Sequence, residues 1–286
     1  MHEEAMHCGR NPELVGIYTQ ADESSAAKKH PIVIFINSGL LPNTGPFRLY
    51  VHLARHLASL GFNSFRFDIS GIGESDRSTN ELPRDKQQVK DICDVMDALE
   101  SRYQNNRFVV MGICTGADNA HKAMVADKRV VGYIGVDGYF YKTKRYYLTF
   151  LLKNVVLGLF KPELWKRKAI EAKTSIRELI EKTVNRKNAL PLASVTMPYR
   201  WEVPPKDQTA RDYREFINNK QSALCVFTAS WPYNYRKQHA DSFPDIEMGD
   251  HIQVQYLESA PHIFPFAKDR ELLTEKMSVW LKERYS

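Results

Sequence analysis

The stretch RFVVMGICTGADNAHKA (107–123) contains the pattern with the clearest chemical meaning in this chain. An apolar run that favours a buried strand, 107–111, passes through GICTG (112–116) directly into a helical pattern. Glycines on either side of such a turn let strand and helix approach closely, and the central residue, here Cys114, is held above the sheet. The helix N-terminus favours the thiolate, which is the nucleophilic form of cysteine. The sequence therefore predicts a nucleophile at Cys114.

A general base is predicted at His262, in the segment APHIF (260–264). Enzymes that hold a nucleophile on this kind of turn carry the acid and then the histidine later in the chain. His262 satisfies that order because it follows the last predicted strand and precedes the final helix. The weaker candidates, by position, are His121, His239 and His251.

Two backbone N–H groups are predicted to stabilise an oxyanion. One belongs to Thr115, the residue after the nucleophile. The other comes from the segment NSGL (37–40), which follows the first predicted strand; Leu40 is the preferred donor and Gly39 the alternative. Such donors stabilise the negative charge that develops on a carbonyl oxygen under attack.

Strand and helix patterns alternate on both sides of the predicted nucleophile. This alternation predicts an α/β fold with a mostly parallel sheet and helices on both faces. The predicted strands cover 32–36, 63–67, 107–111, 130–136, 223–228 and 252–257, and the helices 49–60, 85–103, 117–126 and 271–285.

The alternation stops between residues 138 and 220 and then resumes. We therefore predict a core made of 1–137 and 221–286, with a helical cap, or lid, inserted at 138–220. The most apolar run, 146–160, is interpreted as a lid helix over an apolar substrate, with core packing and a membrane-surface contact as alternatives. It is too short for a membrane span and contains a lysine, so we expect no stable membrane insertion.

Charge is concentrated in the predicted insertion. The chain carries a net charge of +6, and residues 142–220 hold 18 Lys and Arg against 8 Asp and Glu. Such a patch attracts an acidic carrier protein, a phosphate-bearing substrate or a membrane surface, although a solvated helical face has the same composition. No recognised nucleic-acid module accompanies the charge, so nucleic acid is not an expected partner.

The four cysteines show no CxxC or zinc-type spacing, and no other spacing of ligand residues indicates a metal. We therefore expect no metal and no cofactor. The first residues (1–14) lack the pattern of a secretory signal, so we expect a cytoplasmic protein with free thiols.

The motifs together resemble the α/β-hydrolase superfamily. DISGIGESD (68–76) resembles the DxxGxGxSD loop that follows the second of these strands in that family. More narrowly, residues 45–76 and GICTGA (112–117) resemble bacterial hydrolases found with exosortase and polysaccharide-export systems, which also carry a cysteine in the nucleophile elbow. The resemblance covers 32–136 and 223–286, and it implies the α/β-hydrolase fold.

The sequence departs from that family at the acid of the triad. The resemblance implies an aspartate in the loop after the strand 223–228, but no carboxylate follows that strand before Asp241. Asp241 is one candidate. Asp137, directly after the strand 130–136, is the second and preferred one, and Asn234 is a third that would only orient the histidine ring.

These residues predict acyl transfer through a covalent thioester on Cys114. The expected substrate is a small-molecule or carrier-bound ester or thioester. If water is the acceptor, the protein is a hydrolase. The first alternative is an acyltransferase that moves an acyl or aminoacyl group between carrier-protein thiols. The second is a non-catalytic binding protein on a hydrolase scaffold.

Overall fold

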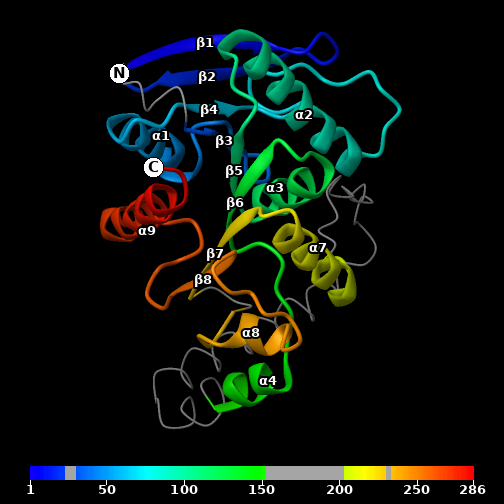
Figure 1. Ribbon diagram of the computed structural model, residues 1–286, viewed down its shortest axis with the longest axis vertical. Coiled ribbons are helices and arrows are strands. Elements are labelled where there is room, and N and C mark those ends of the chain that lie inside the picture. Colours follow the sequence, from blue (N-terminus) through cyan, green and yellow to red (C-terminus); the bar gives the residue numbers. More distant parts are fainter. Residues whose placement is uncertain (23–29, 153–202, 230–232) are drawn as a thin grey trace, which may run out of the picture. The chain divides into compact units, whose positions relative to one another are not determined.

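The apolar runs of the sequence form one eight-stranded sheet (Figure 1). A computed structural model describes residues 1–22, 30–152, 203–229 and 233–286. The strand order is β1-β2-β4-β3-β5-β6-β7-β8. The strands are β1 (His2–Cys8), β2 (Leu14–Gln20), β3 (Ile32–Ile36), β4 (Ser64–Phe67), β5 (Phe108–Ile113), β6 (Val130–Val136), β7 (Ser222–Thr228) and β8 (Ile252–Leu257).

Strands β3 to β8 all pair in parallel, so their carboxyl ends lie at one edge of the sheet. Each is joined to the next through a segment that contains a helix, as parallel strands require. The helices of this part of the chain are α1 (Leu49–Ser59), α2 (Arg84–Tyr103), α3 (Thr115–Ala126), α7 (Lys206–Asn218), α8 (Gln238–Ser242) and α9 (Ala267–Tyr285), with a 3-10 turn, η1, at Pro46–Arg48.

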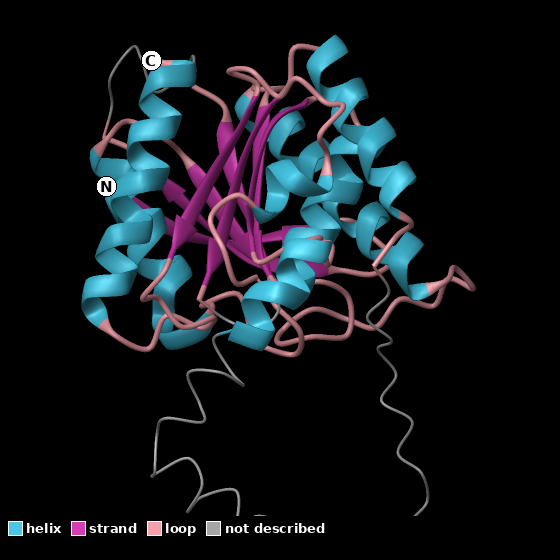
Figure 2. Cartoon of the chain, turned by 90° about the horizontal axis from the view of Figure 1, so that it is seen from below, coloured by secondary structure: helices cyan, strands magenta, loops and turns pink. Residues whose placement is uncertain are grey.

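Helices cover both faces of the sheet (Figure 2). Alternate side chains of a strand point to opposite faces, so a strand that is apolar throughout contributes to two cores. In β3, Ile34 lies in a core with Ile92 of α2 and Phe216 of α7, whereas Phe35 lies in another with Trp280 of α9. The mostly parallel sheet with helices on both faces, predicted from the sequence, is confirmed.

The hairpin of β1 and β2 extends the sheet by two antiparallel strands that the sequence pattern does not predict. β1 reads HEEAMHC, and most of its side chains are exposed or half-buried. An edge strand with few buried side chains has little apolar periodicity, which is why the pattern gives no signal.

The chain divides into two compact units, one made of Met1–Tyr141 with Val203–Ser286 and the other of Lys142–Glu202. The cap predicted at 138–220 stays a prediction, and residues 203–220, which include α7, lie in the unit that contains the sheet. The physical reason is α7, whose Asp212 accepts a hydrogen bond from His121 of α3 at 2.9 Å. In the second unit the structure describes α4 (Lys144–Leu151), and the prediction of a lid helix over 146–160 falls largely outside the described residues.

No helix in the described part of the chain is long and apolar enough to cross a membrane.

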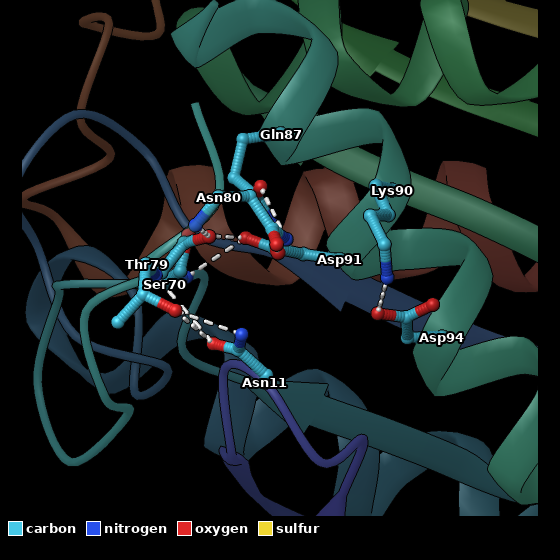
Figure 3. Close-up of polar contacts among 9 residues, drawn as sticks. Asn11, Ser70, Thr79, Asn80, Gln87, Lys90, Asp91 and Asp94 are labelled. Carbon is cyan, nitrogen blue, oxygen red and sulfur yellow. Dashed lines mark hydrogen bonds and ion pairs between the residues drawn. The ribbon is translucent and has the colours of Figure 1, made fainter. Parts of the chain in front are cut away.

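The loop that follows β4 is fixed to α2 by side-chain hydrogen bonds (Figure 3). The backbone N–H and the hydroxyl of Ser70 donate to Asp91 at 2.9 and 2.7 Å, and Gln87 donates to the other oxygen of Asp91 at 2.7 Å. On the other side, Asn11 of the hairpin donates to Thr79 at 2.8 Å. These bonds hold the glycine-rich loop on the edge of the sheet where the parallel strands end.

The turn between β5 and α3 depends on Gly112. A Cβ atom there would lie 2.1 Å from the carbonyl carbon of Gly116, so neither backbone could stay in place.

We expect Gly112→Ala to lower the free energy of unfolding by about 3 kcal/mol, as overpacking of a close contact does. Urea denaturation measures this loss. The matched control is Gly249→Ala, where the new Cβ meets nothing within 4 Å and only a positive φ is strained, so a loss of about 1 kcal/mol is expected. Equal losses for the two variants would contradict the prediction.

Candidate active site

Cys114 lies between the end of β5 and the start of α3, with φ 56° and ψ −123°. A side chain other than glycine is strained in this region of the backbone map, typically by about 1–3 kcal/mol. The strain is held by two backbone bonds. The N–H of Cys114 donates to Val136 at 2.8 Å, and its carbonyl accepts from Ala117 at 2.9 Å. The thiol is partly exposed. A strained backbone with an accessible reactive side chain is typical of a nucleophile elbow.

Gly116 explains why this turn is so tight. A Cβ atom on Gly116 would lie 2.7 Å from the carbonyl oxygen of Ile36, at the end of β3. Together with Gly112, it lets α3 begin directly against two strands. The N-terminus of α3 therefore lies at the carboxyl edge of the sheet, beside the thiol.

His262 lies on the turn after β8, and its Nδ1 is 2.6 Å from Oδ2 of Asp137. Cys114 is the second side chain that acts on this ring, and its interaction with His262 raises the pKa of the imidazole. Because Nδ1 is used by the carboxylate, Nε2 is the nitrogen left to face the sulfur. The side chain of Asp137 is largely buried and that of His262 is about one-third exposed. Three of the residues predicted from the sequence thus lie together, with His262 between Asp137 and Cys114.

Asp137 follows the last residue of β6 and adopts a left-handed backbone, φ 49°, which aspartate tolerates better than most residues. Its N–H donates to Val226 of β7 at 2.8 Å. Its carboxylate accepts the N–H of Thr228 at 2.7 Å on Oδ1 and the hydroxyl of the same residue at 2.6 Å on Oδ2. The carboxylate is therefore held in one orientation by the end of β7.

The hydrogen bond with Asp137 raises the pKa of His262 from its ordinary value to about 10. The interaction with Cys114 raises this pKa further, and partial burial opposes both effects. A group with a raised pKa keeps its proton until the pH rises through that value, so His262 is an imidazolium at neutral pH. A positive ring in this place stabilises negative charge that develops on a neighbouring sulfur during reaction.

The other two candidates for the acid position, Asp241 and Asn234, are hydrogen-bonded to other residues. Asp241, on α8, accepts a hydrogen bond from the hydroxyl of Tyr235 at 2.9 Å. The backbone N–H of Asn234 donates to Gln238 at 3.0 Å. Of the three residues considered for this role, Asp137 is the one that the structure places on His262.

The weaker histidine candidates also have other partners. Nε2 of His121 bonds to Asp212, Nδ1 of His251 lies 3.2 Å from the carbonyl of Gln221, and Nε2 of His239 lies 3.0 Å from the hydroxyl of Tyr213. Burial lowers the pKa of His239 to about 3, so this ring stays neutral.

The loop after β3 contacts the start of α3. The N–H of Gly39 donates to the side-chain oxygen of Thr115 at 2.8 Å, so this amide is not available to a substrate. In the described part of the chain, the N–H groups of Leu40 and Thr115 have no acceptor. This contact leaves Leu40, the preferred donor, rather than Gly39 as the amide that can face a substrate oxygen.

A buried carboxylate, Asp68, fixes that loop in place. It accepts the side chain of Asn37 at 3.0 Å and both the backbone and the side chain of Asn43, at 2.6 and 2.8 Å. Glu74, from the glycine-rich loop, donates its N–H at 3.3 Å. Burial raises the pKa of Asp68, and these hydrogen bonds oppose the rise. Sequence patterns mark the loop at 68–76 but do not show that its first residue positions the loop at 37–43.

Among the described residues, no group of three or more His, Cys, Asp and Glu side chains is arranged to hold a metal ion. The site is built from backbone amides, a thiol, an imidazole and carboxylates.

The family model described as serine aminopeptidase, S33, matches residues 32–201, more than half of the chain and the whole stretch from β3 through the elbow. The chain belongs to this family. It is therefore an α/β hydrolase, and the superfamily implied by the sequence motifs is confirmed. The description of the S33 family names a serine, whereas the residue on the elbow of this member is Cys114.

Solved α/β-hydrolase structures resemble this S33-family member along nearly all of its length. The α/β hydrolase GrgF from Penicillium sp. sh18 is 14% identical, with a TM-score of 0.59, and the alignment covers 100% of this chain and 99% of that one. The esterase Pf2001 from Pyrococcus furiosus is 13% identical, with a TM-score of 0.61 and coverage of 99% and 90%. The mouse alpha/beta hydrolase domain-containing protein 10 is 17% identical, with a TM-score of 0.56 and coverage of 98% and 99%. At such identities the likeness shows the shared fold.

A curated relative, the uncharacterized protein YcjY of Escherichia coli K12, is 35% identical over 79 residues. The match covers 27% of this chain and about a quarter, 26%, of that protein.

Replacing His262 tests the charge at the site. At neutral pH the ring is protonated, since its pKa is raised to about 10, and its charge favours the Cys114 thiolate. We expect His262→Ala to slow the alkylation of Cys114 by iodoacetamide near neutral pH, which moves its pH profile upward, because the positive ring beside the sulfur is lost. The pH dependence of the alkylation rate, followed by mass spectrometry, measures the shift. Burial raises the pKa of Cys93 to about 11, so Cys93 should react slowly in both proteins and serves as the control. An unchanged profile for Cys114 would show that His262 does not set its charge.

Proposed function

We propose that this hydrolase cleaves an ester or a thioester through a covalent acyl-thioester on Cys114. The observation that carries the proposal is the hydrogen bond between Asp137 and His262, a ring that also interacts with the thiol of Cys114 on a strained turn. A buried structural cysteine needs neither the strain nor the imidazole, whereas a nucleophile needs both.

The first half of the reaction acylates the enzyme. The Cys114 thiolate attacks the carbonyl carbon, a C–S bond forms, and the carbonyl electron pair moves onto oxygen. The N–H groups of Leu40 and Thr115 are the proposed donors to this oxyanion, because neither is used elsewhere in the described chain. The tetrahedral species then breaks its bond to the leaving alcohol or thiol, which takes the proton from Nε2 of His262.

The second half releases the acid. Neutral His262 accepts a proton from water as the water oxygen attacks the acyl carbon. The C–S bond breaks, the carboxylic acid leaves, and Cys114 returns to the thiolate beside an imidazolium. Asp137 stays a hydrogen-bond acceptor throughout, where it fixes the ring and stabilises its positive charge.

Transfer of the acyl group to another acceptor is the second candidate function. Its support is the nucleophile itself, because a thioester on Cys114 is close in energy to a thioester on an incoming thiol. An acidic carrier protein would complement the excess of basic residues in 142–220. This acceptor would replace water in the second half of the reaction.

Three finer predictions belong to the same proposal. A cysteine on the elbow supports placement among the cysteine-elbow hydrolases that residues 45–76 resemble. Exposed apolar side chains on α4, among them Tyr147 and Leu148, support a lid function for the part of the predicted insertion that contains this helix. All four cysteines are free, which fits a reducing compartment, and we place the enzyme in the cytoplasm.

Intact-protein mass spectrometry after mixing with p-nitrophenyl esters and acyl thioesters tests the proposal. We expect an acyl adduct on the wild type that is absent from Cys114→Ala and present on Cys93→Ser, the matched control. Loss of the adduct to water indicates a hydrolase, and faster loss to an added thiol or carrier protein indicates a transferase. No adduct and no turnover across the panel would favour the non-catalytic binding scaffold.

Replacing each candidate acid tests the triad. Asp137→Asn removes the charge that stabilises the imidazolium, and we expect kcat/KM for an activated ester to fall by about 100-fold or more. Asp241→Asn, the matched control, keeps a partner for Tyr235, and its kcat/KM should stay within about twofold of the wild type. The reverse ranking would assign the acid to Asp241.

A further inference from the structure

Thr228, the last residue of β7, holds both oxygens of the Asp137 carboxylate. Its backbone N–H donates to Oδ1 at 2.7 Å and its hydroxyl to Oδ2 at 2.6 Å. Oδ2 also accepts from Nδ1 of His262 at 2.6 Å. The two Thr228 donors therefore fix the plane of the carboxylate, and that plane determines where the imidazole ring lies.

The segment around Thr228 also joins the two loops that carry these groups. Two residues earlier, the carbonyl of Val226 accepts the N–H of Asp137 at 2.8 Å. One residue later, the N–H of Ala229 donates to Ala260 at 3.1 Å, on the turn that leads to His262. The end of β7 thus positions the acid loop on one side and the histidine loop on the other.

Thr228 is fully buried, and its β-branched side chain has few rotamers to choose from. A hydroxyl held in this way keeps its direction without further restraint. Charge-assisted bonds from hydroxyl to carboxylate are also stronger than neutral ones. These properties suit a group that must hold a carboxylate still while the charge on its partner ring changes.

We propose that Thr228 is a positioning residue of this active site, acting through Asp137 to orient His262 toward Cys114. The inference rests on the proposed function for the expected loss of turnover. The expected change in the alkylation of Cys114 does not depend on that function. Thr228 occupies the end of the strand after which the family resemblance implies the acid itself. In this chain the acid, Asp137, follows the neighbouring strand β6 instead. The hydroxyl of Thr228 holds the carboxylate of Asp137 where it contacts His262.

Thr228→Val tests the proposal because valine keeps the branched shape and loses the hydroxyl donor. We expect kcat/KM for an activated ester to fall about tenfold and the alkylation profile of Cys114 to move to higher pH, toward that of His262→Ala. The direction follows from the ring, because an imidazole released by its carboxylate holds its proton less tightly and favours the thiolate less. Thr228→Ser keeps the donor and should restore both properties to within about threefold of the wild type.

Thr19→Val is the matched control, since Thr19 is also a fully buried strand threonine but lies on β2, towards the other end of the sheet. It should leave both readouts unchanged. If Thr228→Val does not fold, Thr228→Ala is measured in the same two assays.

Wild-type readouts in the folded variant that lacks the hydroxyl would overturn the positioning role, and so would a loss that Thr228→Ser fails to rescue. A further outcome is a wild type that turns over no substrate while the alkylation profile of Cys114 still differs between the wild type and Thr228→Val. In that case the proposed function fails and the positioning role of Thr228 stands.

Discussion

The peptide group between Val136 and Asp137 is hydrogen-bonded on both sides, and the site depends on it. Its carbonyl accepts the N–H of Cys114 at 2.8 Å, and its N–H donates to Val226 at 2.8 Å. One rigid, planar unit therefore ties the elbow on β5 to the end of β7. Because Asp137 follows the same peptide directly, Cys114 and Asp137 cannot move independently. A strained backbone at position 114 persists only where surrounding bonds determine it in this way.

Electrostatics and geometry support each other around that peptide. The carboxylate of Asp137 accepts three short hydrogen bonds, two from Thr228 and one from His262. The anion raises the pKa of His262 to about 10, which places a positive ring beside the thiol. For a cysteine nucleophile this arrangement is more useful than for a serine, because an imidazolium can stabilise a thiolate in the resting enzyme.

A second network organises the opposite side of the site. Asp68 gathers the loop after β3 and the glycine-rich loop through four hydrogen bonds, and Gly39 is bound to Thr115 at the start of α3. These contacts leave the amides of Leu40 and Thr115 free in the described chain. An oxyanion site made of fixed backbone donors needs little rearrangement during reaction, which is the physical basis of its effect. Both loops lie within residues 32–201, the part of the chain that matches the S33 family.

The sequence by itself determined the alternating strands and helices of the core, because buried parallel strands and amphipathic helices have distinct apolar patterns. It also determined the tight turn at Cys114, since glycines at 112 and 116 mark a close approach. It did not determine the hairpin β1–β2, whose edge strand β1 buries few side chains, nor which acid contacts His262. The sequence offers Asp137, Asp241 and Asn234 as partners of this histidine, and the pairing of β6 with β7 brings Asp137 to the ring. The role of Thr228 was likewise decided by tertiary structure, because a hydroxyl at a strand end has no sequence signature until its acceptor is placed.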